Sequence, residues 1–522
     1  MLTSAYDNNR YCHANWVDAK ILYNGRRPAT ITFPSRPPEI LTPPAPSTPR
    51  VNGPTVFGVR PGNPFLYTIP ATGDRPMKFA VDELPAGLTV DESTGRITGA
   101  IAARGEYYTT LRATNALGTA EKKFRIVAGD TISLTPAMGW NSWNVWGDQV
   151  DQEKVIRAAR ALVKSGLVNH GWTYINIDDA WQSKRGGEFN AIQPNGKFPD
   201  MKGLCDEIHA MGLKVGIYST PWVESYAGYI GGSAENPEGT WEKDKTRAPK
   251  NRRVLPFHLG KHSFAKADAQ QWAAWGIDYL KYDWAPIDVA SAREMYDALL
   301  GTRRDIVYSL SNNATANVLS IAGELSKFVN SWRTTNDIVD TWRNMSNIGF
   351  NQDAWAPHQS PGHFGDPDML VVGYVGWGKP HPTRLTPDEQ YSHISLWCLL
   401  GSPLLIGCDM EKLDEFTISL LTNDEVLAIN QDPLGKQAVH VSRGENVHVY
   451  MKELEDGSRA VGLFNTGPTE ATCTAGWSDL KVSGKQTVRD LWRQTDIGVF
   501  EKQYETTLPP HGVRLLRITR AP

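Results

Sequence analysis

The chain has 522 residues, a formal net charge of −3 and 18 tryptophans. Its length exceeds what one hydrophobic core usually holds, so we expect about three domains. The nearly balanced charge gives no electrostatic basis for binding nucleic acid or an anionic membrane. No apolar run reaches the roughly 18–20 residues that span a bilayer, so no membrane insertion is expected. Tryptophan faces pack against the C–H faces of sugars but also fill protein cores, so their number only suggests a neutral carbohydrate partner.

The cysteines predict neither a disulfide framework nor a zinc site, because they are scattered, odd in number and without a CxxC pair. They are Cys12, Cys205, Cys398, Cys408 and Cys473. The N-terminus has no charged start followed by an apolar segment, so no signal peptide is readable. Strand-like sequence begins abruptly there, and we expect these residues to be the tail of something longer.

Three segments are expected before the main domain. Residues 1–30 include HANWVDAK, which resembles the end of a carbohydrate-binding module, and residues 31–50 are rich in proline, which favours an extended linker. Residues 51–130 alternate short β-type runs with Gly, Pro and Asp turns, as in a small β-sandwich. Within them, LPAGLTVDESTGRITG resembles the immunoglobulin-like module often found beside bacterial glycosidase domains. No cluster of exposed aromatic residues is evident in this module, so we expect a spacer rather than a ligand binder.

Residues 131–428 alternate apolar β-type runs with helical stretches, which predicts parallel strands joined by crossover helices and, at this size, a (β/α)8 barrel. Helices such as DQEKVIRAARALVKSG have apolar residues three and four apart and end at a glycine. The strands are expected at 137–143, 173–181, 214–220, 279–284, 305–311, 327–334, 366–373 and 403–409. Residues 429–522 contain short alternating strands, which predicts a C-terminal antiparallel β-sandwich.

Carboxylates gather where the predicted barrel strands end. Active sites of such barrels lie at the carboxyl ends of the strands, and aspartates follow the second, fourth, sixth and seventh strands. Aromatic residues stand among them, which is the combination that glycoside cleavage needs. The aspartates are Asp178, Asp179, Asp283, Asp337, Asp366 and Asp368, and the aromatic residues are Trp140, Trp181, Tyr218, Trp284 and Trp332.

Each aspartate also has a structural interpretation. An aspartate after a strand often caps a helix, and this interpretation applies most strongly to Asp337 in TTNDIVDTW, which precedes a predicted helix. Asp283 lies inside an apolar strand run, where a buried carboxylate is costly unless it has a partner. Lys281, two residues earlier, faces the same side of the strand and is the expected partner.

Six motifs in order resemble the signature segments of glycoside hydrolase family 27, the α-galactosidase or melibiase family. They are MGWNSW at 138–143, NIDDAW at 176–181, GLKVGIY at 212–218, GIDYLKYDW at 276–284, WRTTNDI at 332–338 and GDPDML at 365–370. The resemblance covers about 300 residues of the barrel together with the C-terminal β domain, and it implies retaining hydrolysis of terminal α-galactosides without a cofactor or metal.

The resemblance also implies roles for individual residues. Asp283 would be the nucleophile, and Asp337 would be the general acid and base. Lys281 and Arg333 would help to keep Asp283 ionised, whereas a less compensated Asp337 would hold its proton. The implied sugar-binding residues are Trp140, Asp178, Asp179, Tyr218, Lys281, Ser311, Asn312, Ala314, Arg333, Asp366 and Met369.

The sequence departs from the family pattern in three places. Where many members have Cys-Glu-Trp after the fifth strand, this chain reads YSLSNNAT; Ser311 and Ala314 resemble the arrangement that admits a 2-acetamido group, while Asn312 could equally bind a free 2-hydroxyl. The family's loop disulfide beside the nucleophile has no counterpart. The segment 222–262 is rich in Gly, Lys and Arg, and we expect it to form a rim around the active site that differs from the rim in other family members.

Several alternatives stay open. α-N-acetylgalactosaminidase and β-L-arabinopyranosidase activities both occur in the family, but a pentose lacks the 6-hydroxymethyl group, and we expect an unsatisfied Asp178 or Asp179 to disfavour it. A metal-dependent enzyme would use the aspartates with His363, although no HxH or helically spaced His pair is present. A catalytically silent sugar-binding barrel is the non-enzymatic alternative. The expected partner is an oligo- or polysaccharide with terminal α-galactosyl units, and the accessory modules imply a secreted or periplasmic protein.

Overall fold

The computed structural model describes residues 38–241, 257–311 and 315–522. Residues 39–522 form one compact unit. The predicted carbohydrate-binding tail, residues 1–30, lies outside the described residues, as do residues 31–37 of the predicted linker. The described end of that linker contacts the main domain, because the backbone N–H of Leu41 donates to the Tyr391 hydroxyl and the Thr42 hydroxyl donates to the Ser419 carbonyl.

Residues 50–128 form an immunoglobulin-like arrangement of strands, as the sequence predicts. A four-stranded sheet of order β2-β9-β8-β5 and a three-stranded sheet of order β3-β7-β6 enclose a core of their own, and β1 pairs with β4. The strands are β1 (Arg50–Val51), β2 (Val56–Val59), β3 (Phe65–Thr68), β4 (Ala71–Thr72), β5 (Lys78–Asp82), β6 (Leu88–Val90), β7 (Arg96–Gly99), β8 (Gly105–Asn115) and β9 (Gly118–Ala128).

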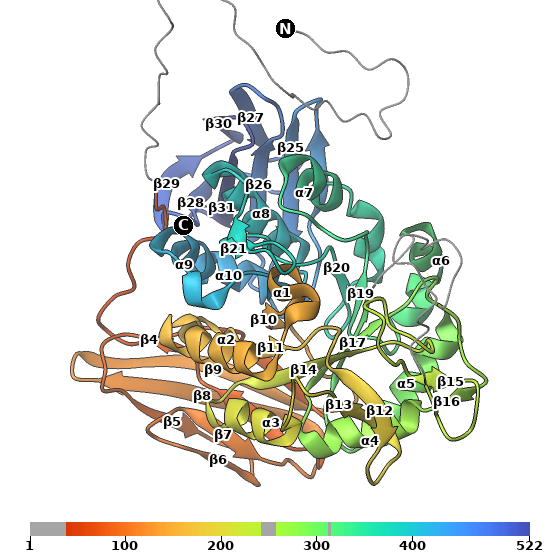
Figure 1. The fold of residues 1–522 in the computed structure, drawn as a ribbon. Coiled ribbons are helices and arrows are strands. Elements are labelled where there is room, and N and C mark those ends of the chain that lie inside the picture. The colour runs from red at the N-terminus through yellow and green to blue at the C-terminus, as the bar shows by residue number, and fades with distance from the viewer. Residues whose placement is uncertain (1–37, 242–256, 312–314) are drawn as a thin grey trace, which may run out of the picture. The chain divides into compact units, whose positions relative to one another are not determined.

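The central domain is a curled sheet of parallel strands, which confirms the predicted barrel (Figure 1). Its order is β20-β19-β18-β17-β14-β11-β10-β23. The sheet closes on itself because the N–H of Leu370, just after β20, donates to the Leu405 carbonyl in β23 at 2.8 Å. The strands are β10 (Met138–Asn141), β11 (Tyr174–Asn176), β14 (Lys214–Ser219), β17 (Tyr279–Asp283), β18 (Val307–Ser311), β19 (Ser331–Arg333), β20 (Phe364–Asp366) and β23 (Leu404–Ile406).

The seventh strand differs from its expected position at 366–373, because β20 ends at Asp366. Pro367 has no N–H to continue the hydrogen-bond ladder, and Asp368 adopts a left-handed backbone with φ of 85°. The chain resumes pairing only at Leu370. Asp368 and Met369 therefore lie in an irregular turn at the carboxyl end of the strand.

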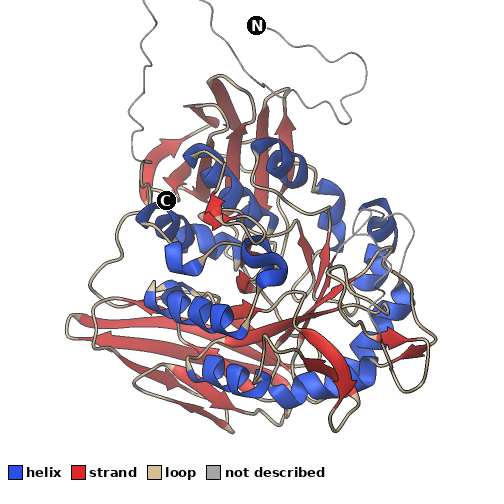
Figure 2. Cartoon of the chain, viewed as in Figure 1, coloured by secondary structure: helices blue, strands red, loops and turns tan. Residues whose placement is uncertain are grey.

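Helices surround the curled sheet (Figure 2). Side-chain caps fix where several of them begin: Asp151 accepts the N–H of Lys154 at the start of α2, and Thr386 forms a reciprocal capping box with Glu389 at the start of α8. The helices are α1 (Trp143–Trp146), α2 (Gln152–Lys164), α3 (Met201–Ala210), α4 (Ala265–Trp275), α5 (Val289–Leu300), α6 (Thr315–Leu325), α7 (Trp342–Gly349), α8 (Pro387–Leu400), α9 (Glu415–Leu421) and α10 (Asp424–Asn430).

Short elements decorate the loops between these strands and helices. The short 3-10 helices are η1 (Gly147–Gln149), η2 (Leu167–His170), η3 (Asp353–His358) and η4 (Met410–Lys412). The paired short strands are β12 (Gln182–Gly186) with β13 (Ala191–Pro194), β15 (Ser233–Ala234) with β16 (His262–Ser263), and β21 (Tyr374–Val375) with β22 (His381–Pro382).

The C-terminal domain is antiparallel, as predicted. A six-stranded sheet of order β24-β25-β26-β31-β28-β29 packs over the β27–β30 pair around a separate apolar core. The strands are β24 (Val439–Arg443), β25 (Val447–Glu453), β26 (Arg459–Asn465), β27 (Ala471–Gly476), β28 (Gln486–Asp490), β29 (Thr495–Phe500), β30 (Gln503–Leu508) and β31 (Val513–Arg520). No helix within the described ranges is long and apolar enough to cross a membrane.

The immunoglobulin-like module contacts the amino ends of the barrel strands. Arg60 and Asn63 both hydrogen-bond to Asp305, which precedes β18, and the Thr68 hydroxyl donates to the Gly212 carbonyl, which precedes β14. The carboxyl ends of the strands, where the predicted active-site residues lie, are therefore left uncovered by this module.

Candidate active site

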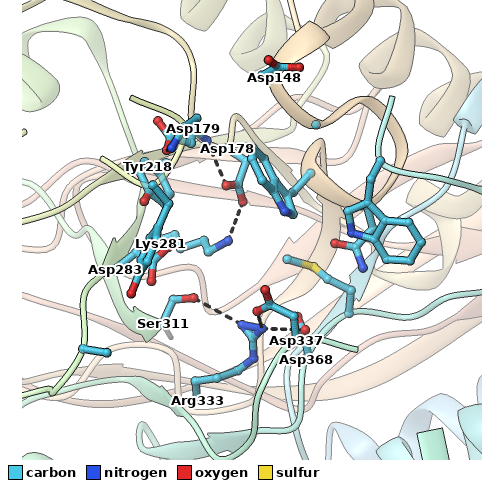
Figure 3. A pocket seen from close by; sticks show the side chains of 18 of the residues that line it. Asp148, Asp178, Asp179, Tyr218, Lys281, Asp283, Ser311, Arg333, Asp337 and Asp368 are labelled. Atoms are coloured by element: carbon cyan, nitrogen blue, oxygen red, sulfur yellow. Dashed lines mark hydrogen bonds and ion pairs between the residues drawn. The ribbon is translucent and has the colours of Figure 1, made fainter. Parts of the chain in front are cut away.

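A cavity of about 890 Å³ lies at the carboxyl ends of the barrel strands (Figure 3). Nine of the residues proposed from the sequence line it, although they are far apart along the chain. They are Asp178, Asp179, Tyr218, Lys281, Asp283, Ser311, Arg333, Asp337 and Met369. Parallel strands bring these positions together because all their carboxyl ends open on the same side of the barrel.

Lys281 and Asp178 form a buried ion pair on one side of the cavity. The Lys281 ammonium donates to Asp178 Oδ2 at 2.8 Å, and Asp178 Oδ1 accepts the backbone N–H of Asp179 at 2.9 Å. Although burial disfavours the charged ammonium, Asp178 and Asp283 raise the pKa of Lys281 above its ordinary value. Lys281 therefore stays a cation. Its ion-pair partner is Asp178 and not Asp283, the partner expected from the sequence.

Asp179 is buried and already has hydrogen-bond donors on both carboxylate oxygens. Oδ1 accepts from the Ala180 N–H, the Gln182 amide and the Ser225 hydroxyl, and Oδ2 accepts from the Ala227 N–H at 2.9 Å. Burial nevertheless raises the pKa of Asp179. Because the protein satisfies this carboxylate by itself, the argument that a pentose would leave Asp179 unsatisfied does not hold.

Asp283 is buried yet has an oxygen without a partner. Only 6% of the residue is exposed, and Oδ1 has no hydrogen-bond donor among the residues that the structure describes. Burial raises the pKa of Asp283 to about 7; the cations Lys281 and Arg333 lower it, and the carboxylates Asp337 and Asp178 raise it further. The two cations thus do not outweigh burial, in contrast to the expectation from the sequence.

Arg333 organises the opposite side of the cavity. Its guanidinium donates to Asp337 at 2.7 Å, to Asp368 at 2.5 Å and, more weakly, to the Ser311 hydroxyl at 3.3 Å. The Asp337 side chain is 67% exposed at the cavity mouth, whereas Arg333 is buried. Asp337 is therefore directly paired with a cation, which differs from the less compensated Asp337 expected from the sequence.

Two proposed sugar-binding residues are not among those that line the cavity. Trp140 is fully buried, and its indole N–H donates to the Cys408 carbonyl at 2.8 Å. Asp366 accepts the N–H of Asp368 at 2.8 Å, and burial raises the pKa of Asp366 to about 6. Asn312 and Ala314 lie outside the described residues. The roles of these four residues stay predictions.

Asp368 lines the cavity; the sequence analysis grouped it with the carboxylates at the strand ends but gave it no role in the site. Its carboxylate accepts from Arg333 and from the Ile338 N–H at 2.8 Å, so it fixes the residues around Asp337. Burial raises the pKa of Asp368 while Arg333 lowers it. A usable signal was its position directly before Met369, since adjacent residues in an irregular turn can both point to the same opening.

Aromatic side chains form much of the remaining cavity rim. Trp222, Tyr226 and Phe257 come from the segment that follows β14, and the rings of Trp222 and Phe257 are stacked with centroids 4.8 Å apart. Trp143, on α1, and Trp377, between β21 and β22, line the cavity as well. The sequence predicted an unusual rim at 222–262 but did not single out these side chains.

Comparison with known proteins matches three family models to successive parts of the chain. An alpha galactosidase A (melibiase) model matches residues 135–242 and 254–432, a C-terminal β-sandwich model of alpha galactosidases matches 444–518, and an Ig domain model matches 48–129. Alpha-galactosidase 2 of Arabidopsis thaliana is 36% identical over 404 residues, which are 76% of this chain and 92% of that protein.

Two solved structures bear on the site. A protein of Bacteroides fragilis provisionally designated an α-galactosidase/melibiase matches with a TM-score of 0.80 and 31% identity, covering 92% of this chain and 99% of its own. A β-L-arabinopyranosidase of Geobacillus stearothermophilus matches with a TM-score of 0.64 and 27% identity, covering 74% and 97%. With the family model matching more than half of its length, the chain belongs to glycoside hydrolase family 27, the α-galactosidase or melibiase family.

Proposed function

We propose that this protein is a retaining exo-glycosidase that hydrolyses terminal α-galactosides. The observation that carries the proposal is Asp283 Oδ1, a buried carboxylate oxygen without a partner that lines the same cavity as a second carboxylate, Asp337. A buried carboxylate oxygen without a donor is costly, so its presence at the carboxyl end of a barrel strand favours a chemical role. The match to the α-galactosidase family also supports α-galactoside hydrolysis as the reaction.

In the proposed reaction, Asp283 attacks the anomeric carbon while Asp337 donates a proton to the departing glycosidic oxygen. A covalent galactosyl–Asp283 ester results, and the aglycone leaves as an alcohol. Asp337, now a carboxylate, then removes a proton from a water molecule that attacks the anomeric carbon; the bond from that carbon to Asp283 breaks, and galactose is released with net retention. Arg333, paired to Asp337, stabilises the negative charge that this residue carries after the first step.

We propose that Asp178, Asp179 and Lys281 bind the sugar hydroxyls. The Asp178–Lys281 pair presents an acceptor and a donor side by side, which suits the vicinal hydroxyls of a pyranose. Asp179 Oδ2 has one protein donor and capacity for a further hydroxyl. Ser311 and Arg333, on the other side, would contact the 2-position.

A β-L-arabinopyranoside is the second candidate substrate. Asp179 is satisfied by protein donors without any ligand, so a sugar lacking the 6-hydroxymethyl group leaves no unpaired carboxylate there. α-N-acetylgalactosaminide hydrolysis stays an alternative that rests on Ser311 and Ala314, of which the structure describes only Ser311.

The test compares initial rates on p-nitrophenyl α-galactopyranoside, α-N-acetylgalactosaminide and β-L-arabinopyranoside. The Asp283→Asn protein serves as the blank, because it keeps the shape of the site without a nucleophile. We expect the galactoside to react fastest and the Asn variant to be inactive on all three. Turnover of none by the wild-type protein would instead support a sugar-binding barrel without catalysis, and substantial activity of the variant would refute Asp283 as the nucleophile.

We further propose that the natural substrate is an oligo- or polysaccharide outside the cytoplasm, so that the protein is secreted or periplasmic. The immunoglobulin-like module beside the barrel supports this proposal, because such modules accompany polysaccharide-degrading enzymes. Fractionation of the producing cells would test it.

A further inference from the structure

The cavity is larger than a terminal sugar alone requires. Its volume of about 890 Å³ lies near the upper end of the roughly 300–1,000 Å³ range of sites that bury drug-sized ligands. Of the residues proposed to bind galactose, Asp178 and Asp283 are buried and Lys281 is half-buried, and Figure 3 shows the three around the same opening. The aromatic rim encloses the remaining space. A second sugar ring therefore has room inside the cavity, and the rim offers two sets of aromatic side chains that could contact it.

The proposed chemistry decides between these two sets. In a double displacement the nucleophile attacks from the face opposite the departing group, and the general acid lies on the side of the departing group. The ring next to galactose must therefore lie on the Asp337 side. An exo-enzyme has no further sugar on the other side of galactose, because that sugar is the terminal one.

Strand order places the aromatic residues that follow β14 and the one that follows β20 on different sides. Trp222, Tyr226 and Phe257 follow β14, which pairs with β17, the strand that ends in Asp283. Trp377 follows β20, which pairs with β19, the strand that leads to Asp337. Trp143 follows β10, which pairs with β11 and β23 and lies three strands from both β17 and β19 in the closed sheet, so strand order assigns it to neither side. Trp377 thus belongs to the side of the general acid.

The backbone holds Trp377 in a costly conformation. Its φ is 48°, in the left-handed region that a bulky residue rarely adopts. Hydrogen bonds keep it there: the N–H groups of Gly376 and Trp377 both donate to the Asn144 carbonyl, and that of Gly378 donates to the Val145 carbonyl at 2.8 Å. The same contacts tie the Trp377 turn to α1, which carries Trp143. Such strain is retained where surrounding structure enforces it, often at ligand-binding sites.

We propose that Trp377, supported by Trp143, is the binding platform for the sugar ring that departs from galactose. The inference rests on the proposed function and extends it: the preferred substrates are oligosaccharides in which the α-galactosyl unit is linked to a second pyranose. The half-buried Trp377 indole stacks on the C–H face of that pyranose and holds the glycosidic oxygen near Asp337. This contact acts in the transition state of galactosyl transfer and not in galactose binding.

The experiment compares kcat/KM for melibiose, a disaccharide of galactose and glucose, with kcat/KM for α-galactosyl fluoride, whose leaving group has no ring. Trp377→Asn removes the indole while keeping a residue that tolerates the left-handed backbone. We expect it to lower kcat/KM for melibiose about tenfold and to change that for the fluoride less than about twofold. Trp377→Phe restores an aromatic face, and we expect it to recover most of the melibiose rate.

Phe257→Ala is the matched control, because Phe257 is an aromatic rim residue on the Asp283 side. We expect it to leave the ratio of melibiose to fluoride rates unchanged. The proposal would be overturned if Trp377→Asn lowered kcat/KM equally for both substrates, or for neither. It would also be overturned if only Phe257→Ala lowered the ratio of melibiose to fluoride rates. If the wild-type protein hydrolyses neither substrate, the proposed function fails, and the proposed role of Trp377 fails with it. If the wild-type protein hydrolyses both and Trp377→Asn leaves the ratio of melibiose to fluoride rates unchanged, only the role of Trp377 is refuted.

Discussion

The two ends of strand β17 carry buried aspartates in opposite environments. Asp278 precedes the strand and Asp283 ends it, and each is 6% exposed. Asp278 lies 2.8 Å from His209 Nε2 and accepts from the Val215 N–H and the Arg304 guanidinium. Although burial raises the pKa of Asp278, His209 and Arg304 outweigh burial and hold it below its ordinary value. Asp283 has no donor on Oδ1 among the described residues, and its pKa rises to about 7.

The comparison teaches that the same residue type on one strand serves stability at the amino end and reactivity at the carboxyl end. A satisfied carboxylate is a structural element that is expensive to remove, because its donors would be left buried. An unsatisfied one destabilises the fold but keeps an oxygen available for chemistry. The predictions that follow test whether Asp278 serves stability and Asp283 serves reactivity.

The largest expected effect is on turnover by Asp283→Asn. Because the amide cannot form the covalent intermediate, we expect kcat to fall on the order of 10⁴-fold or more. Initial rates on p-nitrophenyl α-galactopyranoside measure this loss, and circular dichroism checks that the variant is folded. A loss below about a hundredfold in a folded variant would contradict the assignment of Asp283.

The next effect is on stability at the amino end. Asp278→Asn removes the charge that His209 and Arg304 share, and we expect the free energy of unfolding to fall by about 3–5 kcal/mol. The kcat of the molecules that remain folded should stay at the wild-type value, because Asp278 is remote from the cavity lining. Chemical unfolding and rates at low temperature measure the two quantities. A loss of kcat without a loss of stability would contradict the structural role assigned to Asp278.

Asp283→Asn should also stabilise the fold, and more so at alkaline pH. The pKa of Asp283 is about 7 in the folded chain against an ordinary 3.8, so the charged form costs free energy in the folded state. Below pH 4 both states are protonated and the cost vanishes; above pH 7 both are ionised and the cost is complete, roughly 4 kcal/mol. We therefore expect the Tm advantage of the Asn variant to be larger at pH 8 than at pH 4.5. An equal advantage at both pH values would refute the shift.

The smallest effect concerns the pH dependence of the rate. Because Asp283 must be ionised to attack, kcat/KM of the wild-type protein should fall as pH drops below about 7. The Asp337 carboxylate raises the pKa of Asp283, so Asp337→Asn should move this acid limb to lower pH. α-Galactosyl fluoride is the substrate for this profile, since fluoride departs without a general acid. An acid limb that stays in place or moves to higher pH would show that Asp337 does not act on Asp283.

The sequence was sufficient to predict the layers of the fold and nine of the residues that line the cavity. Apolar strand runs alternating with amphipathic helices are a local signal, and their carboxyl ends meet whenever the strands are parallel. Residues such as Asp178, Lys281 and Asp283 could therefore be grouped from their positions alone. The seventh strand was the exception, because Pro367 ends the ladder before the apolar run that marked it.

What the sequence could not predict is how the charges pair. Lys281 is two residues from Asp283 and on the same side of the strand, yet it binds Asp178 from β11's loop. Arg333 binds Asp337 and Asp368 instead of Asp283. These choices depend on distances between different strands, and no pattern along one strand encodes them. Asp368 was grouped with the strand-end carboxylates but given no role for the same reason, since its partner Arg333 comes from another strand.

The hydrogen bonds at Asp179 link the proposed sugar contact to the position of the segment that follows β14. The carboxylate proposed to contact the sugar also anchors Ser225 and Ala227, and thereby the segment that carries Tyr226 and begins the aromatic rim. Any mutation that retunes sugar preference at this position would also loosen that segment. A lineage can therefore acquire a new sugar at this site only together with compensating changes in the segment, so its inherited substrate preference is protected against single mutations.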